Sequence, residues 1–178
     1  DLMIHDIDIA LNLVDSPVAG LEAVGTKVLS ETEDLASARL TFENGCTVMV
    51  KASRVAIQKS RKMRIFCRDS YLSLDYIAKT GMRMGFKEGF DRKNINIQEM
   101  AKMEADQGSY PLFTKYFNIE QLHVASDEPL KNELKSFLHA VKTGREPVVT
   151  GLHGLQAIEI ATRIQLKIKE QQDKLGGF

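Results

Sequence analysis

Two runs of alternating apolar and polar residues flank the dipeptide Asn44-Gly45, and this pattern constrains the fold of the 178-residue chain more than any other feature. The runs cover residues 36–42 and 47–53. Alternation with a period of two is typical of strands with one buried face. Asn-Gly readily supplies the positive φ angles of a tight primed turn. The sequence therefore predicts an antiparallel β-hairpin here.

Further strand-like runs follow the hairpin, at residues 63–68, 71–76, 83–87 and 116–124. The first two pair around Asp69-Ser70, and the set predicts a mainly antiparallel sheet. Residues 88–111 lose periodicity and become polar, so we expect a long excursion there, with one short strand at residues 95–98.

Helical periodicity occurs at both ends of the chain. An opening helix over residues 2–14 is stopped by Pro17, because proline removes a backbone donor. A second helix is introduced by Ser126-Asp-Glu-Pro129 and closed by Gly144, with apolar positions at Leu130, Leu134, Phe137, Leu138 and Val141. A third begins near Thr150 or Gly151 and carries Leu155, Ile158, Ala161, Ile164 and Ile168 at core spacing. This order predicts an α+β fold, an open-faced sheet with helices packed on one face.

The uncovered face of that sheet is expected to be mixed in character. Its residues are Met49, Ile65, Ile119, Thr41, Lys51, Ser73 and Gln121. Such a face is suited to pairing with another subunit, and the alternative is a solvated surface with scattered apolar side chains.

Composition excludes several classes of partner. Lysine and arginine total 24 and aspartate and glutamate total 24, so no summed field attracts nucleic acid or an anionic membrane. Apolar residues make up 43% of the chain, which is typical of a soluble globular domain. Cys46 and Cys67 lie in strand-like segments without metal-ligand spacing, and we interpret them as reduced core thiols of a cytoplasmic protein. Because helical periodicity begins at once from Asp1, the chain is expected to be an excised domain.

A polar stripe crosses the otherwise apolar opening helix at Asp1, His5 and Asp8. Spacings of four and three residues place these side chains on one helix face. An imidazole held between two carboxylates has a fixed orientation, which suits a general acid or base at neutral pH. The alternative is structural: Asp1 favours the helix start, and His5 with Asp8 forms an exposed pair.

Other candidates are weaker. His123, His139 and His153 are interpreted as structural, and Lys59-Ser-Arg61-Lys62 as a solvated loop end that is also suited to meeting a phosphate. The sequence contains no glycine-rich dinucleotide motif, no zinc spacing and no nucleophile elbow. Cofactor chemistry therefore cannot be completed by this chain alone.

The segment Asp1-Leu-Met-Ile-His5-Asp-Ile-Asp8 resembles the Asp-x-x-x-His-x-x-Asp helix signature of the Gfo/Idh/MocA oxidoreductases. Further similar segments follow in the same order, at Ala38 to Gly45, Leu130 to Phe137, Gly144 to Pro147 and Gly154 to Ala157, so that the resemblance extends over essentially the whole chain. The form of the signature, with Glu22-Ala-Val-Gly25, is similar to family members that oxidise the 3-position of UDP-N-acetylglucosamine.

The resemblance implies a two-domain enzyme in which a Rossmann domain, absent from this chain, holds NAD or NADP. Residues 1–178 would form one substrate-binding and oligomerisation domain, like the C-terminal domains of dihydrodipicolinate reductase and glucose-fructose oxidoreductase. The resemblance assigns proton transfer from a sugar, polyol or nucleotide-sugar hydroxyl to His5, its orientation to Asp1, and a nearby substrate contact to Asp8. A catalytic lysine, usually in Glu-Lys-Pro, belongs to the absent half, and Glu146-Pro147 is not its equivalent.

The resemblance leaves two alternatives open. The same fold serves non-catalytic sensors of sugars or dinucleotides, and the chain alone would also suit a dimerisation module. If the enzyme reading is right, we expect His5 to face the cleft where the substrate meets its electron acceptor, and we expect this fragment alone to be inactive.

Overall fold

The computed structural model describes residues 2–91, 96, 98, 102, 114–123 and 128–174. The elements in chain order are α1 (Ile4–Leu13), β1 (Val18–Thr26), β2 (Leu35–Phe42), β3 (Thr47–Ser53), β4 (Lys62–Phe66), β5 (Ser70–Asp75), β6 (Thr80–Phe86), β7 (Phe117–His123), α4 (Pro129–Thr143) and α5 (Gly151–Lys174). All strand pairings in this set are antiparallel, which confirms the α+β class with its order of helix, strands and two helices. The chain divides into two compact units, Asp1–Ile57 with Pro129–Phe178, and Gln58–Glu128.

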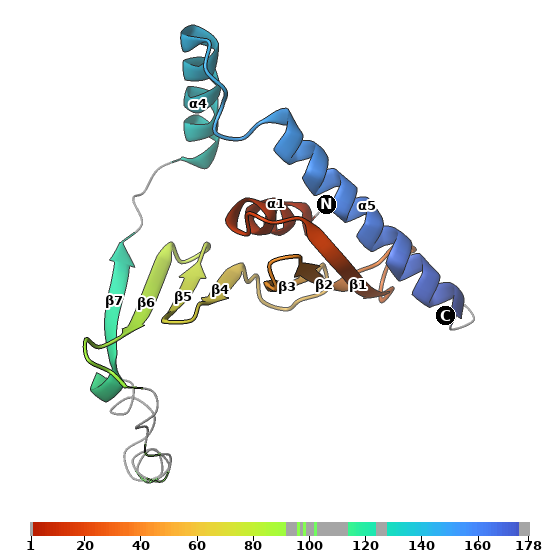
Figure 1. The fold of residues 1–178 in the computed structure, drawn as a ribbon. Coiled ribbons are helices and arrows are strands. Elements are labelled where there is room, and N and C mark those ends of the chain that lie inside the picture. The colour runs from red at the N-terminus through yellow and green to blue at the C-terminus, as the bar shows by residue number, and fades with distance from the viewer. Residues whose placement is uncertain are drawn as a thin grey trace. The chain divides into compact units, whose positions relative to one another are not determined.

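The first unit contains a three-stranded sheet in the order β1-β2-β3, with α1 and α5 packed on it (Figure 1). The inward side of β2 supplies Ala38, Leu40 and Phe42, each at most 2% exposed. The register places Ala38 beside Val50. Alternation along β2 therefore predicts the buried face correctly. The hydrophobic core lies between this sheet, α1 and α5.

Strand β1 was not among the strands expected from the sequence. Its half-buried and exposed residues largely alternate, but Gly20 and Gly25 occupy two of the half-buried positions and provide no side chain that would mark a strand. At Gly25 the missing side chain has a packing reason, because an added Cβ would lie 2.7 Å from Ile168 Cγ2 on α5. The glycine thus allows the strand and the helix to approach closely.

The β2–β3 hairpin is confirmed, but its turn differs from the expected two-residue type. The Gly45 amide donates to the Phe42 carbonyl at 2.9 Å, and the Phe42 amide donates to the Cys46 carbonyl at 2.9 Å. Only Gly45 of this turn has a positive φ, at 85°, while the Asn44 side chain accepts from the Cys46 amide at 3.0 Å. The connection is therefore a three-residue loop with a glycine bulge.

The helices at the end of the chain bury only part of the side chains expected, since Ile164 and Ile168 of α5 are buried as predicted but the other apolar positions differ. On α5 the buried stripe is Ala157, Ile160, Ile164 and Ile168, whereas Leu155 and Ile158 are 61% and 56% exposed. Two apolar stripes overlap on this helix, and the one with the small Ala157 faces the core. On α4 only Ala140 is buried, and the expected apolar positions are all more than half exposed. Gly144 follows α4 with a φ of 67°, as expected for a helix-closing glycine.

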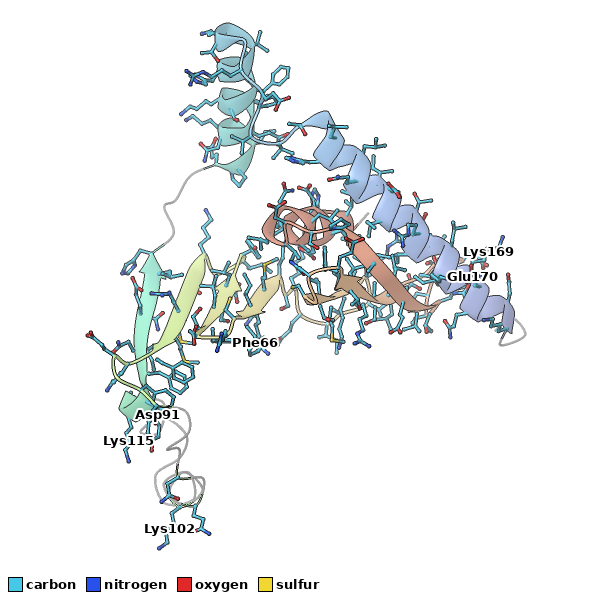
Figure 2. The ribbon with its side chains drawn as sticks, in the orientation of Figure 1. Phe66, Asp91, Lys102, Lys115, Lys169 and Glu170 are labelled. Carbon is cyan, nitrogen blue, oxygen red and sulfur yellow. The ribbon has the colours of Figure 1, made fainter. Side chains whose placement is uncertain are left out.

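The second unit contains a four-stranded sheet in the order β4-β5-β6-β7. The expected grouping of Ile65 with Ile119 on one open face is wrong, because Ile65 is aligned with Leu72 and Arg83, whereas Ile119 is aligned with Met84 and Tyr71. Phe66, labelled in Figure 2, shares the face of Ile119, is 78% exposed and lies 4.9 Å from the Tyr71 ring.

The cysteine prediction is half right. Cys46 and Cys67 are both free thiols, but both are exposed, because one lies in the hairpin turn and the other directly follows β4. The short strand expected at residues 95–98 falls largely outside the described residues. None of the helices in the described part has the length and apolar character to cross a membrane.

Candidate functional site

Helix α1 presents the predicted polar stripe on the side away from the core. Ile7 and Ala10 are buried, at 0% and 4% exposure, and they fix the helix to the sheet and α5. His5 is exposed and Asp8 is half-buried, so the two side chains share the outer side of the helix one turn apart. Asp1, the third member of the stripe, lies outside the described residues. The structure therefore supports the placement of His5 and Asp8 on an accessible surface.

Asn12 extends this stripe by one turn, and it was not singled out from the sequence. Its side-chain Nδ2 donates to Asp8 Oδ1 at 3.1 Å and to the Asp8 carbonyl oxygen at 2.8 Å. The spacing of four residues after Asp8 is the signal that would have revealed it, because such positions are neighbours on a helix.

A cavity of about 460 Å³ lies in the same unit, between the start of α1, the α5 helix and the end of β3. Its walls combine apolar side chains such as Ile4, Ile7 and Ile164 with the polar Arg54 and Thr162. His5 and Asp8 do not line this cavity. The expectation that His5 faces a cleft is therefore not met by this cavity.

The segment before β2 contains a buried carboxylate with several hydrogen bonds, that of Asp34. Asp34 is 5% exposed and accepts from the amides of Leu29, Val28 and Ser30 at 2.7, 2.9 and 2.9 Å. The Ser30 hydroxyl donates to it at 2.8 Å. These bonds, led by the Leu29 amide, hold the pKa of Asp34 well below its ordinary value. All its partners are local loop groups, so we assign the carboxylate to holding the loop.

Among the remaining histidines, His153 has a side-chain hydrogen bond within the described part of the chain. His153 Nδ1 accepts from the Thr150 amide at 3.3 Å, which closes the start of α5. His123 and His139 are exposed on β7 and α4.

The basic cluster is engaged within its own unit. Lys62 forms an ion pair with Asp75 at 3.1 Å, and the Arg61 guanidinium lies 5.4 Å from the centre of the Tyr76 ring. These contacts favour the reading of a surface loop end over a phosphate site.

The described residues do not provide a dinucleotide or metal site of a familiar kind. Their strands pair only in antiparallel fashion, whereas a Rossmann site needs parallel strands and a glycine-rich turn into a helix. No group of three or more histidine, cysteine, aspartate or glutamate side chains that could hold a metal gathers in this part of the chain. A nicotinamide dinucleotide therefore does not fit the described residues as its main holding site.

Comparisons with known proteins relate this chain to the C-terminal domains of oxidoreductases. Residues 1–73 match the model of the GFO/IDH/MocA C-terminal domain. UDP-N-acetylglucosamine 3-dehydrogenase from Acidithiobacillus ferrooxidans is 27% identical over 169 residues, which cover 95% of this chain and 48% of the relative. The chain thus spans about half the length of this curated relative.

Solved structures extend the likeness over nearly the whole chain. The structure of UDP-N-acetylglucosamine 3-dehydrogenase from Acidithiobacillus ferrooxidans superposes with a TM-score of 0.77 at 27% identity, covering 96% of this chain and 48% of that one. An aldose-aldose oxidoreductase from Caulobacter crescentus gives a TM-score of 0.67 at 16% identity, covering 95% of this chain and 44% of that one, and shows the shared fold. The family model covers α1, β1, the β2–β3 hairpin and β4, and the solved structures share the fold, so the chain is similar to the C-terminal domains of the Gfo/Idh/MocA oxidoreductases.

Proposed function

We propose that this chain is the substrate-binding half of an NAD(P)-dependent dehydrogenase that oxidises a hydroxyl of a sugar, polyol or nucleotide sugar. The observation that carries the proposal is the outward placement of His5 and Asp8 on a helix whose opposite side is anchored by Ile7. This helix lies within the residues that match the family model. The relative at 27% identity, named for UDP-N-acetylglucosamine, favours a nucleotide sugar as substrate.

In the proposed mechanism His5 moves the proton of the substrate hydroxyl. An imidazole is suited to this at neutral pH, because its two protonation states are both accessible there. Asp1 would orient the imidazole, and Asp8 would accept a hydrogen bond from a second substrate hydroxyl. Removing the hydroxyl proton raises the electron density at the carbinol carbon, which favours departure of its hydride. The nicotinamide dinucleotide that accepts the hydride would be held by residues outside this chain. The lysine that works with His5 would also lie there.

The remaining assignments belong to the same proposal. Residues 1–178 would act as one substrate-binding and oligomerisation domain, joined in the longer protein to a Rossmann domain. An open sheet face would pair with a second subunit, and the enzyme would work in the cytoplasm. The fragment alone would be inactive, because its described residues offer no main site for the dinucleotide.

The test is a steady-state kinetic comparison in the intact enzyme, with NAD or NADP and a panel of nucleotide sugars. We expect His5→Ala to lower kcat by about two to four orders of magnitude, the usual contribution of a positioned acid or base. His139→Ala is the matched control, because it removes an exposed imidazole from α4. It should retain the activity of the unmodified enzyme.

Unchanged kinetics in His5→Ala would remove this residue from the mechanism. Tight binding of a sugar nucleotide without turnover in the unmodified protein would instead favour the sensor alternative.

A further inference from the structure

Asn12 occupies the next position along the polar stripe of α1, and within the described residues its side chain forms hydrogen bonds with Asp8. The two N–H groups of one amide suffice for both bonds, one to the Asp8 carbonyl and one to Oδ1. The backbone bond fixes the amide against the helix, and the second bond fixes one oxygen of the carboxylate. Within the described residues, Asp8 Oδ2 has no hydrogen-bond partner.

We propose that Asn12 is a positioning residue, which holds the Asp8 carboxylate so that Oδ2 accepts a hydrogen bond from a substrate hydroxyl. The inference rests on the proposed function, because it concerns how the same site recognises its sugar. A carboxylate on an accessible helix surface otherwise samples several rotamers. Ordering that side chain during binding reduces affinity, so an amide that orders it beforehand improves affinity without entering the chemistry.

This role predicts a specific kinetic signature in the intact enzyme. Asn12→Leu keeps a side chain of similar size and removes the amide, so KM for the sugar substrate should rise about 2- to 10-fold, the range for one lost hydrogen bond. Because the interaction acts equally on the ground state and the transition state, kcat should change less than about 2-fold. Asn12→Gln keeps the donor on a longer stem and should restore most of the loss.

A double-mutant cycle separates positioning from a general effect on the helix. In an Asp8→Ala background the carboxylate is gone, so Asn12→Leu should raise KM no further. Leu13→Ala is the control for the same helix end, because Leu13 is 58% exposed and carries no amide. Thermal unfolding of each variant shows whether the fold is kept.

Three outcomes would overturn the inference. They are an unchanged KM in Asn12→Leu, an equal rise in KM with and without the Asp8 carboxylate, or a loss confined to kcat. If the unmodified enzyme turns over and depends on His5 while Asn12→Leu is silent, only the role of Asn12 fails. If the unmodified enzyme oxidises none of the sugars tested, the proposed function fails and the role of Asn12 fails with it.

Discussion

Replacing Gly25 by alanine tests the close contact between β1 and α5. The added Cβ would lie 2.7 Å from Ile168 Cγ2 and 3.0 Å from Ile168 Cδ1, so close that the strand, the helix or the Ile168 side chain would have to shift. The Ile168 side chain is 3% exposed and belongs to the core, so it cannot turn aside into solvent. Forcing one extra carbon into a packed core costs about 1–3 kcal/mol. For a chain of this size, that corresponds to a decrease in Tm of roughly 2–12 °C.

The assay is urea unfolding followed by circular dichroism, with Ile168→Ala and the double variant completing a cycle. Ile168→Ala alone leaves a cavity and should cost about 2–5 kcal/mol. In the double variant the repulsion is absent, so the two costs should not add, and the coupling should lie between about 0.5 and 3 kcal/mol in the stabilising direction. Strict additivity, or a Gly25→Ala variant as stable as the unmodified chain, would refute the close contact of β1 with α5.

Three further changes test the unit that carries α1. Ile7→Ala should destabilise the chain by about 2–5 kcal/mol in urea unfolding, because Ile7 is 0% exposed. Gly45→Val should cost about 1–3 kcal/mol in the same assay, because a β-branched residue is strained at a φ of 85°. Asp34→Asn should lower stability at pH 7 and flatten its decline below about pH 4. The lowered folded pKa means that this carboxylate stabilises the fold above its unfolded pKa, and the contribution is lost as pH falls toward the folded pKa. A steep acid decline that survives in Asp34→Asn would contradict this assignment.

The sequence predicts those elements whose signal is local. The hairpin was recognisable because alternation and Asn44-Gly45 both report on the same few residues, and α1 because Pro17 ends it. Strand β1 was missed because Gly20 and Gly25 provide no side chain that would mark a strand. For Gly25 the packing reason lies on α5, more than a hundred residues away. Local patterns do not carry such a distant constraint.

The direction in which an apolar residue points is harder to predict than the element that contains it. On α5 two apolar stripes overlap, and packing against the core selects the one through Ile160. On β4 and β7 a register that the sequence does not encode locally decides that Ile65 and Ile119 occupy opposite faces. Which apolar side chains are buried therefore depends on the packing partners of each helix and strand, and a single sequence does not identify those partners.

The polar stripe was predictable for the opposite reason, since its spacing on one helix needs no distant partner. The structure adds that the opposite side of α1 is buried, because Ile7 and Ala10 pack in the core while His5 is exposed and Asp8 is half-buried. A proton-transfer group that stays in water competes with solvent for its substrate, and excluding water strengthens its electrostatic interactions. A helix fixed on one side and polar on the other is consequently suited to be one wall of a site that a second surface completes. The relative of about twice this length contains enough additional chain to supply that surface.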